Sequence, residues 1–463
     1  MFFGALIFAP WAYGGTTATS IVVINWLIGA SLLLWAVELA INRRKPNIPL
    51  TLVLICAVLC LIGAWMLFNA KAIYDPEFGT FVRMANFSQG APGSLDYALS
   101  AAWMVRGALL LLSILFVVDL SQDDKALIQL WAAIVISGGS IALLGLLQKA
   151  TGAHAILWQT PVGYSGGNFF ATYYYHANAG AFLNLILPFT AGFAVRAFGT
   201  PSSSGVRALW LTIFLLSLAA VAANTSRMAQ LIGALIIVAL VIRFGARVVR
   251  GFSRSEKNVM LAGAAAVLFV MYAIGRSSHL EEPIHRWEKL SDQISADARW
   301  SVSRIALHTL PDAGLLGSGP GTFRAVFPAF NRAAEHPLPG QWRFLHEDYL
   351  QTVIEWGWIG SAFWGALFFG GIGVAVLSLR RQNALRRSQK SGVSGQKSLR
   401  GNQVGQWNWR RRVVLPSAFV ALVGVALHAL VDFPLQIESI QLYVAACLGL
   451  CWGSAVWKVE SRK

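Results

Sequence analysis

Apolar runs of about 20 residues recur along almost the whole chain, and each is long enough to cross a bilayer as a helix. Only 13% of the 463 residues are charged, which is too few to cover a soluble domain. The sequence therefore predicts an all-α polytopic membrane protein with about twelve transmembrane helices. These helices are expected at residues 3–14, 19–42, 49–69, 97–119, 126–148, 177–195, 207–223, 227–243, 259–275, 347–379, 413–431 and 438–457.

Lys and Arg gather in loops on one side of the predicted bundle. These loops are NRRKPN, RFGARVVRGFSRSEK, the stretch 380–412 with ten charges, and the C-terminal KVESRK. Because positive loops face the cytoplasm, we expect the opposite side to be periplasmic in a bacterial inner membrane. This asymmetry accounts for the formal net charge of +16, so we expect no nucleic-acid partner. The Gly- and Ser-rich 380–412 loop is expected to be disordered; a site for lipid headgroups or a partner is the alternative.

One long polar segment, residues 276–346, interrupts the apolar pattern on the predicted periplasmic side. Residues 280–295 and 299–309 have helix-compatible spacing, and GLLGSGPGTF and an aromatic stretch at 323–330 follow. The segment therefore predicts a helical cap on the outer membrane surface. The expected organisation is a transmembrane bundle at 1–275, the cap at 276–346, and C-terminal helices at 347–463 with the basic loop at 380–412.

Four residues near this segment could carry chemistry. Arg227 stands at the outer end of an apolar run, where it could bind an anion or reach the membrane interface. Arg299 and Arg304 could bind a phosphate or diphosphate with forked hydrogen bonds, or could be surface charge. His346 opens the next apolar run and could accept a proton, with Glu347 or Asp348 orienting it; a polar interface residue is the alternative.

A Gly-rich stretch and two pairs of cysteines could suggest cofactor binding, but we interpret both as parts of the structural framework. GSGPGTF is not followed by GK[ST], so we interpret it as a tight turn that closes the cap rather than as a phosphate loop. Cys56 and Cys60, like Cys447 and Cys451, are spaced four apart within apolar runs, as expected for packing residues on a helix face. With no metal-ligand cluster visible, we expect neither a metal nor a cofactor.

Four motifs in a fixed order give the chain a resemblance to a known family. They are TSR at 225–227, R-x4-R-x2-L from Arg299 followed by GLLGSGPGTFRAVFPAF, HEDYLQTVIEWGWIG from His346, and HALVDFPL at 428–435. In this combination the chain resembles the O-antigen ligase and polymerase superfamily of membrane glycosyltransferases. It departs from the usual ligase pattern at Glu347, where Asn, Ser or Gln is common, and at Ser303, where Trp or Tyr is common.

The resemblance implies a metal-independent enzyme that takes a glycan from undecaprenyl diphosphate and moves it to an acceptor hydroxyl on the periplasmic face. The acceptor would be the lipid A core or another glycan. The residues that match the family's functional positions are Arg227, Arg299 and His346. Arg227 and Arg299, with Arg304 beside them, would bind the diphosphate. His346 would position or deprotonate the acceptor hydroxyl. Membrane lipids would be further partners.

Several functions remain open from the sequence. A polymerase of O-antigen or exopolysaccharide units would use the same residues as a ligase, and so would a transferase that glycosylates protein Ser or Thr. A transporter of lipid-linked glycans is a different class of protein. Such transporters usually contain two related halves with interrupted spans, and we find no such repeat in this sequence.

Overall fold

The computed structural model describes residues 1–85, 87–161, 169–200, 202–251, 258, 265, 298–391 and 409–457. Within these ranges nine helices are long and apolar enough to cross a membrane, so the prediction of an all-α polytopic protein is confirmed. Apart from residue 265, the expected span at 259–275 falls outside the described residues, and so does the whole expected helix at 280–295. The nine helices are α2 (Ala18–Ile41), α3 (Leu50–Phe68), α4 (Tyr97–Leu120), α5 (Asp124–Ala150), α6 (His176–Phe198), α7 (Ser204–Ala223), α8 (Arg227–Gly251), α14 (Asp348–Ser391) and the continuous stretch Arg410–His428, formed by η5 (Arg410–Val414) and α16 (Leu415–His428).

Two further apolar helices are shorter than a full span. The first is α1 (Phe2–Trp11), which is followed by the short η1 (Tyr13–Gly15). Gly14 turns the chain there with φ +66, and a Cβ at this position would lie 2.5 Å from the Tyr173 ring. The second short helix is α17 (Glu438–Gly453).

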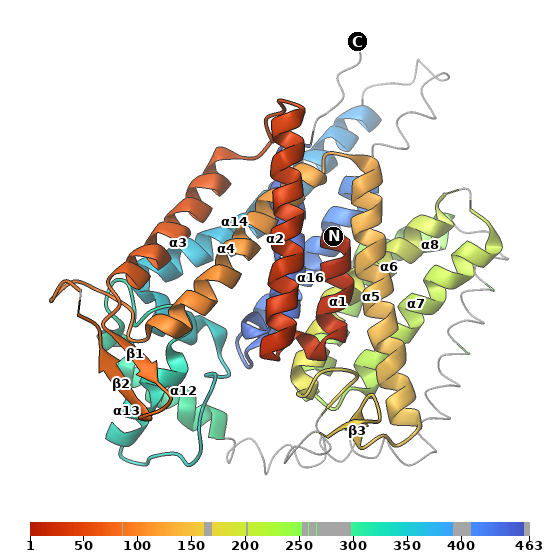
Figure 1. Ribbon diagram of the computed structural model, residues 1–463. Helices are drawn as coiled ribbons and strands as arrows, with labels where there is room; N and C mark the ends of the chain where they lie inside the picture. Colours follow the sequence, from red (N-terminus) through yellow and green to blue (C-terminus); the bar gives the residue numbers. More distant parts are fainter. Residues whose placement is uncertain are drawn as a thin grey trace.

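The helices from both halves of the chain share one apolar core. Helix α17 packs on α4, α16 packs on α6 and α8, and α1 packs on α5. In Figure 1, α1 lies between α2 and α5 near the middle, α3, α4 and α14 lean to one side, and α7 and α8 lean to the other. Helix α6 is the most buried of the long helices, with 89% of its apolar window inside the protein. Its first residues are therefore held firmly at one end of the bundle.

The cap covers one end of the bundle, below α3 and α4 in Figure 1. Its described part contains α12 (Ala298–Thr309), η4 (Leu310–Ala313) and α13 (Phe323–Ala333), which confirms the helix expected at 299–309. A hairpin of β1 (Ala72–Asp75) and β2 (Thr80–Arg83) lies beside it, and β3 (Ala155–Ile156) pairs with β4 (Thr160–Pro161) elsewhere at this end. The cap has its own small core of Val302, Ala306, Phe323, Phe327, Leu345 and Ile354.

Helix α14 is broken at Gly357, whose φ of +63 and ψ of −172 interrupt the helical backbone. The segment 314–319 fills the break with backbone hydrogen bonds: Ser318 N donates to Ile354 O at 2.9 Å, and Trp358 N donates to Gly314 O at 3.2 Å. A Cβ at Gly317 would lie 2.4 Å from the Glu355 backbone, so only glycine fits there. GSGPGTF is therefore a turn that docks the cap onto α14, in agreement with the sequence interpretation.

The basic end of the bundle differs from the prediction in one respect. Residues 380–391 continue α14 as a helix and are not part of a disordered loop. Arg, Gln, Ala and Leu in this stretch favour helix, and they outweigh the loop-like composition of the residues that follow. Residues 392–408 of the predicted loop lie outside the described residues. Arg410 then binds the end of α4, donating to Ser121 O and Gln122 O at 2.9 Å each.

Candidate active site

His346 occupies a constrained turn directly before α14. Its φ is +64, a left-handed conformation that costs free energy for a residue with a side chain. Two hydrogen bonds hold the turn: Leu345 N donates to Gln351 Oε1 at 3.0 Å, and Asp348 N donates to Ala429 O at 2.9 Å. The turn therefore fixes the position of the imidazole at the junction between the cap and the bundle.

The partner of His346 is Asp432, in the loop between α16 and α17. His346 Nδ1 lies 3.1 Å from Asp432 Oδ1. Glu347 and Asp348, which were expected to orient the histidine, bond to other groups, so neither is its direct partner. Glu347 instead accepts the Tyr349 and Leu350 N–H groups at the start of α14. Burial raises the pKa of Glu347, although these two hydrogen bonds lower it.

Asp348 joins the two segments that carry this pair. One of its carboxylate oxygens accepts from Leu435 N at 2.8 Å, and the other accepts from Gln436 Nε2 at 2.9 Å. Leu435 and Gln436 belong to η6 (Pro434–Gln436), which directly follows Asp432 in the chain. Since Asp348 follows His346 by two residues, its hydrogen bonds hold the loop of Asp432 against the turn of His346.

Asp432 is buried and collects several donors. Tyr175 OH donates to Oδ2 at 3.2 Å, Phe433 N donates to Oδ1 at 3.0 Å, and Arg299 Nη1 lies 3.8 Å from Oδ2. Arg299 Nη2 also donates to the hydroxyl of Tyr175. Burial by itself raises the pKa of Asp432. The hydrogen bond with His346 and the positive charge of Arg299 outweigh this effect, so the pKa lies below the usual range and the carboxylate is ionised.

This arrangement defines what His346 can do chemically. An ionised carboxylate only accepts hydrogen bonds, so His346 donates to Asp432 from Nδ1 and Nε2 is left able to take a proton. Asp432 would also stabilise the imidazolium that forms when Nε2 is protonated. The side chain of His346 is 19% exposed and that of Arg299 is 37% exposed, so both can be reached from solvent.

A cavity of about 370 Å³ borders His346 on the cap side. Aromatic rings form much of its wall: Phe344 and Phe433 stack with centroids 4.8 Å apart, and Trp342 meets His346 edge-on at 6.0 Å. Aromatic faces suit the apolar C–H faces of a sugar ring, and an imidazole beside them can reach its hydroxyl groups. The remaining wall residues are Pro339, Gly340, Gln341 and Arg343.

The other predicted residues lie at the same end of the protein. Arg227 is the first residue of α8, and the preceding turn is tied to α6 because Asn224 Nδ2 donates to His176 O at 2.9 Å. His176 follows Tyr175, so Arg227 starts its helix near the Tyr175 end of α6. Arg304 lies on α12 and is exposed. The roles of Arg227 and Arg304 in binding a diphosphate stay predictions.

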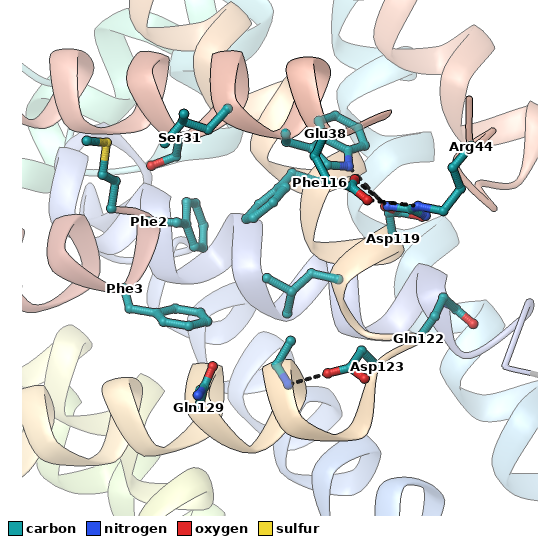
Figure 2. A pocket seen from close by; sticks show the side chains of 15 residues that line it. Phe2, Phe3, Ser31, Glu38, Arg44, Phe116, Asp119, Gln122, Asp123 and Gln129 are labelled. Atoms are coloured by element: carbon teal, nitrogen blue, oxygen red, sulfur yellow. Dashed lines mark hydrogen bonds and ion pairs between the residues drawn. The ribbon is translucent and has the colours of Figure 1, made fainter. Parts of the chain in front are cut away.

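The largest pocket described, about 750 Å³, is at the other end of α4 (Figure 2). The cap end of α4 is marked by Ser100, which donates to Pro320 O, whereas this pocket surrounds Asp119 near the last turn. Arg44 binds Asp119 with both terminal nitrogens, at 2.8 and 2.7 Å, and also contacts Glu38. Trp35 Nε1 donates to the same carboxylate at 2.9 Å. These charges satisfy one another, so we do not place the active site here.

Three residues of the cluster were not recognised from the sequence: Tyr175, Asp432 and Phe433. Asp432 had a signal, because it is a carboxylate among apolar residues in HALVDFPL, a motif that contributed to the resemblance. Tyr175 had none, since it follows two other tyrosines and its position depends on α6. No group of three or more His, Cys, Asp or Glu side chains within the described ranges could hold a metal ion. All four cysteines are unpaired and lie within α3 and α17.

A family model described as O-antigen ligase matches residues 212–365. The match covers about a third of the chain and supports its resemblance to the O-antigen ligase and polymerase superfamily. The matched segment contains Arg227, Arg299 and His346, whereas Tyr175 and Asp432 lie outside it. The match, together with the nine apolar helices of the described residues, supports a multi-pass membrane glycosyltransferase of the ligase or polymerase type. A comparison with curated proteins gave no match.

Proposed function

We propose that the protein transfers a glycan from undecaprenyl diphosphate to an acceptor hydroxyl, as an O-antigen ligase on the periplasmic face of a bacterial inner membrane. The main support is the contact of His346 with Asp432 beside Arg299, at the end of the bundle covered by the cap. A proton acceptor, a cation for the leaving group and an aromatic cavity are thus adjacent. The reaction requires these three elements together.

In the proposed reaction the acceptor oxygen attacks the anomeric carbon of the donor sugar. The bond between that carbon and the diphosphate oxygen breaks, and the diphosphate leaves with the electron pair. His346 takes the hydroxyl proton on Nε2, and Asp432 stabilises the resulting imidazolium. Arg299, together with Arg227, stabilises the negative charge that develops on the leaving diphosphate. The arginines would thereby supply the charge stabilisation that a metal ion provides in other transferases.

Two substitutions test this mechanism on purified protein in nanodiscs with a lipid-linked donor. His346→Ala should lower the transfer rate by about 10²–10⁴-fold while donor binding persists. Arg299→Lys keeps the charge but loses the forked hydrogen bonds, and should lower the rate by roughly 10²–10³-fold. The matched controls are His308→Ala and Arg332→Lys, both exposed on the cap. Rates within about tenfold of wild type for both active-site variants would refute the mechanism.

A polymerase of O-antigen or exopolysaccharide units is the alternative, because it would use the same residues on a different acceptor. The two are separated by incubating the protein with donor alone. A polymerase joins donor units into a ladder of products, whereas a ligase forms product only when a separate acceptor such as the lipid A core is added. A ladder from donor alone would overturn the ligase assignment and leave the roles of His346 and Arg299 unchanged.

A further inference from the structure

The pocket of about 750 Å³ at the basic end of the bundle is a cleft between α1, α2, α4 and α5 (Figure 2). Figure 2 shows Phe2 toward one end of the cleft, and Arg44, Asp119 and Asp123 toward the other. The ring of Phe116 lies between these ends and meets that of Phe2 edge-on, with centroids 5.1 Å apart. The cleft therefore has an aromatic half and a charged half.

The two halves have the order that a membrane lipid requires. Helix α4 runs from the cap to the basic end, so Phe116 lies about one turn closer to the middle of the membrane than Asp119 does. Leu34 on α2 lines the cleft and is 55% exposed, and only 28% of the apolar window of α2 is buried. The exposed face of such a helix contacts lipid, so the cleft opens sideways to the leaflet on the basic side. A headgroup fits the charged half while its acyl chain follows the aromatic half.

The charges of the cleft favour a cationic headgroup. Among the described side chains that line it are the carboxylates of Glu38, Asp119 and Asp123, against the single guanidinium of Arg44. Arg44 binds Asp119 with both terminal nitrogens and also donates to Glu38. Its positive charge is thus already compensated, and an excess of negative charge is left on the lining. This excess attracts an ammonium group and repels a second anion.

Asp123 supplies an acceptor for such an ammonium. It is the N-cap of α5, where its Oδ2 accepts from Ala126 N at 2.7 Å. Its Oδ1 has no hydrogen-bond partner among the described residues, and the side chain is exposed. A primary ammonium carries three N–H donors, whereas a trimethylated ammonium carries none. The cleft should therefore distinguish an ethanolamine headgroup from a choline headgroup.

We propose that this cleft binds one molecule of phosphatidylethanolamine from the leaflet on the basic side of the bundle. Its ammonium donates to Asp123, its phosphate stays at the aqueous edge, and one acyl chain lies along Phe2 and Phe116. The bound lipid fills the space between α2 and α5 and joins these helices at the end of the bundle opposite the cap. The site is separate from the residues of the proposed transfer reaction.

Two variants test the site, and each has a matched control. Asp123→Asn removes the charge but keeps a side-chain oxygen that can cap α5, because Asn and Asp are about equally good caps. Its control is Asp312→Asn, at an exposed carboxylate on the cap. Ala126→Trp places a large ring in the cleft from the first turn of α5. Its control is Ala150→Trp, at the exposed last residue of the same helix.

Binding is measured by native mass spectrometry on the delipidated full-length protein, with phosphatidylethanolamine, phosphatidylcholine and phosphatidylglycerol of identical acyl chains. Wild type should bind one phosphatidylethanolamine about tenfold more tightly than either other lipid, through the hydrogen bond to Asp123 and the remaining negative charge. Asp123→Asn should lower this preference roughly threefold, the contribution of an exposed ion pair. Ala126→Trp should abolish the tight site, and both controls should bind like wild type.

Each contrary result overturns a defined part of the proposal. Equal or tighter binding of phosphatidylglycerol would refute recognition of the ammonium, and equal binding of phosphatidylcholine would refute N–H donation to Asp123. Unchanged binding by Ala126→Trp, or an equal loss in Ala150→Trp, would refute the assignment to the cleft. Competition by soluble glycerophosphoethanolamine at the same concentration as the lipid would refute binding of the acyl chain.

Thermal unfolding without lipid checks that each variant is folded. If Ala126→Trp does not fold, the lipid preference of Asp123→Asn decides by itself, and a ratio equal to that of wild type refutes the proposal. Because the assay involves no glycan transfer, its failure is distinguishable from a failure of the proposed function.

Discussion

Substitution of Asp348 is a demanding test of the site. Asp348 should affect the transfer rate by holding the loop of Asp432 in place, and not by contacting the substrate. In Asp348→Ala the Leu435 N–H loses its acceptor, and so does the Gln436 amide. An unsatisfied buried donor costs about 1–3 kcal/mol. Gln436 can turn toward solvent, so we expect the free energy of unfolding to fall by roughly 1–3 kcal/mol, mainly from Leu435. The freed loop should also displace Asp432 from His346, and a shift of about 1 Å costs about 10²-fold in rate.

Asp348→Asn separates geometry from charge. The amide oxygen of Asn can still accept from Leu435 N, and its NH₂ group can donate to Gln436 once that side chain flips. We expect transfer rates within a fewfold of wild type for Asn and a large loss for Ala, measured beside thermal unfolding in detergent. Asp312→Ala, an exposed carboxylate on the cap, is the control. Equal losses for Asn and Ala, or a wild-type rate for Ala, would show that Asp348 does not act by holding the loop.

Three other expectations follow from the described geometry. An impermeant thiol reagent applied from the periplasm should label Glu335→Cys on the cap and not Lys45→Cys near the basic end; the opposite pattern would reverse the proposed orientation. Transfer should persist in EDTA, and a loss restored by a divalent ion would contradict leaving-group stabilisation by arginine. Because the pKa of Asp432 is lowered from 3.8, its contribution to stability should be present at neutral pH and lost as pH falls through the lowered pKa. This contribution is the difference in unfolding free energy between wild type and Asp432→Asn; a decline between pH 7 and 5 would contradict it.

The transmembrane helices could be predicted because each is encoded by its own apolar run. The helix at 299–309 could be predicted for a similar reason, from local spacing. From the sequence, Arg299 and His346 were connected only through the resemblance, which gives Arg227, Arg299 and His346 roles in the same transfer reaction. The structure places Arg299 near Asp432, the partner of His346, and leaves the contribution of Arg227 as a prediction.

The partner of His346 could not be found by local reasoning. Asp432 is 86 positions away, and Tyr175 reaches the same carboxylate from 257 positions away. The neighbouring Glu347 and Asp348 looked better suited, but their carboxylates are committed to backbone N–H groups and to Gln436. The break at Gly357 was also hidden, since VIEWGWIG reads as continuous apolar helix and the segment that fills the gap lies about forty residues earlier in the chain.

The break in α14 also determines which segments could be exchanged with those of a related protein to make a functional chimaera. The backbone groups released around Gly357 are paired by residues 314–319, and Glu355 accepts from Gly321 N and Phe323 N at the start of α13. A cap taken from a relative would leave these groups unpaired at membrane depth unless its own docking turn matched. An exchange designed to alter acceptor choice should therefore move residues 313–323 and 351–359 together as one cassette. Exchange boundaries placed at the ends of the polar segment 276–346 would separate the docking turn from the residues of α14 that it contacts.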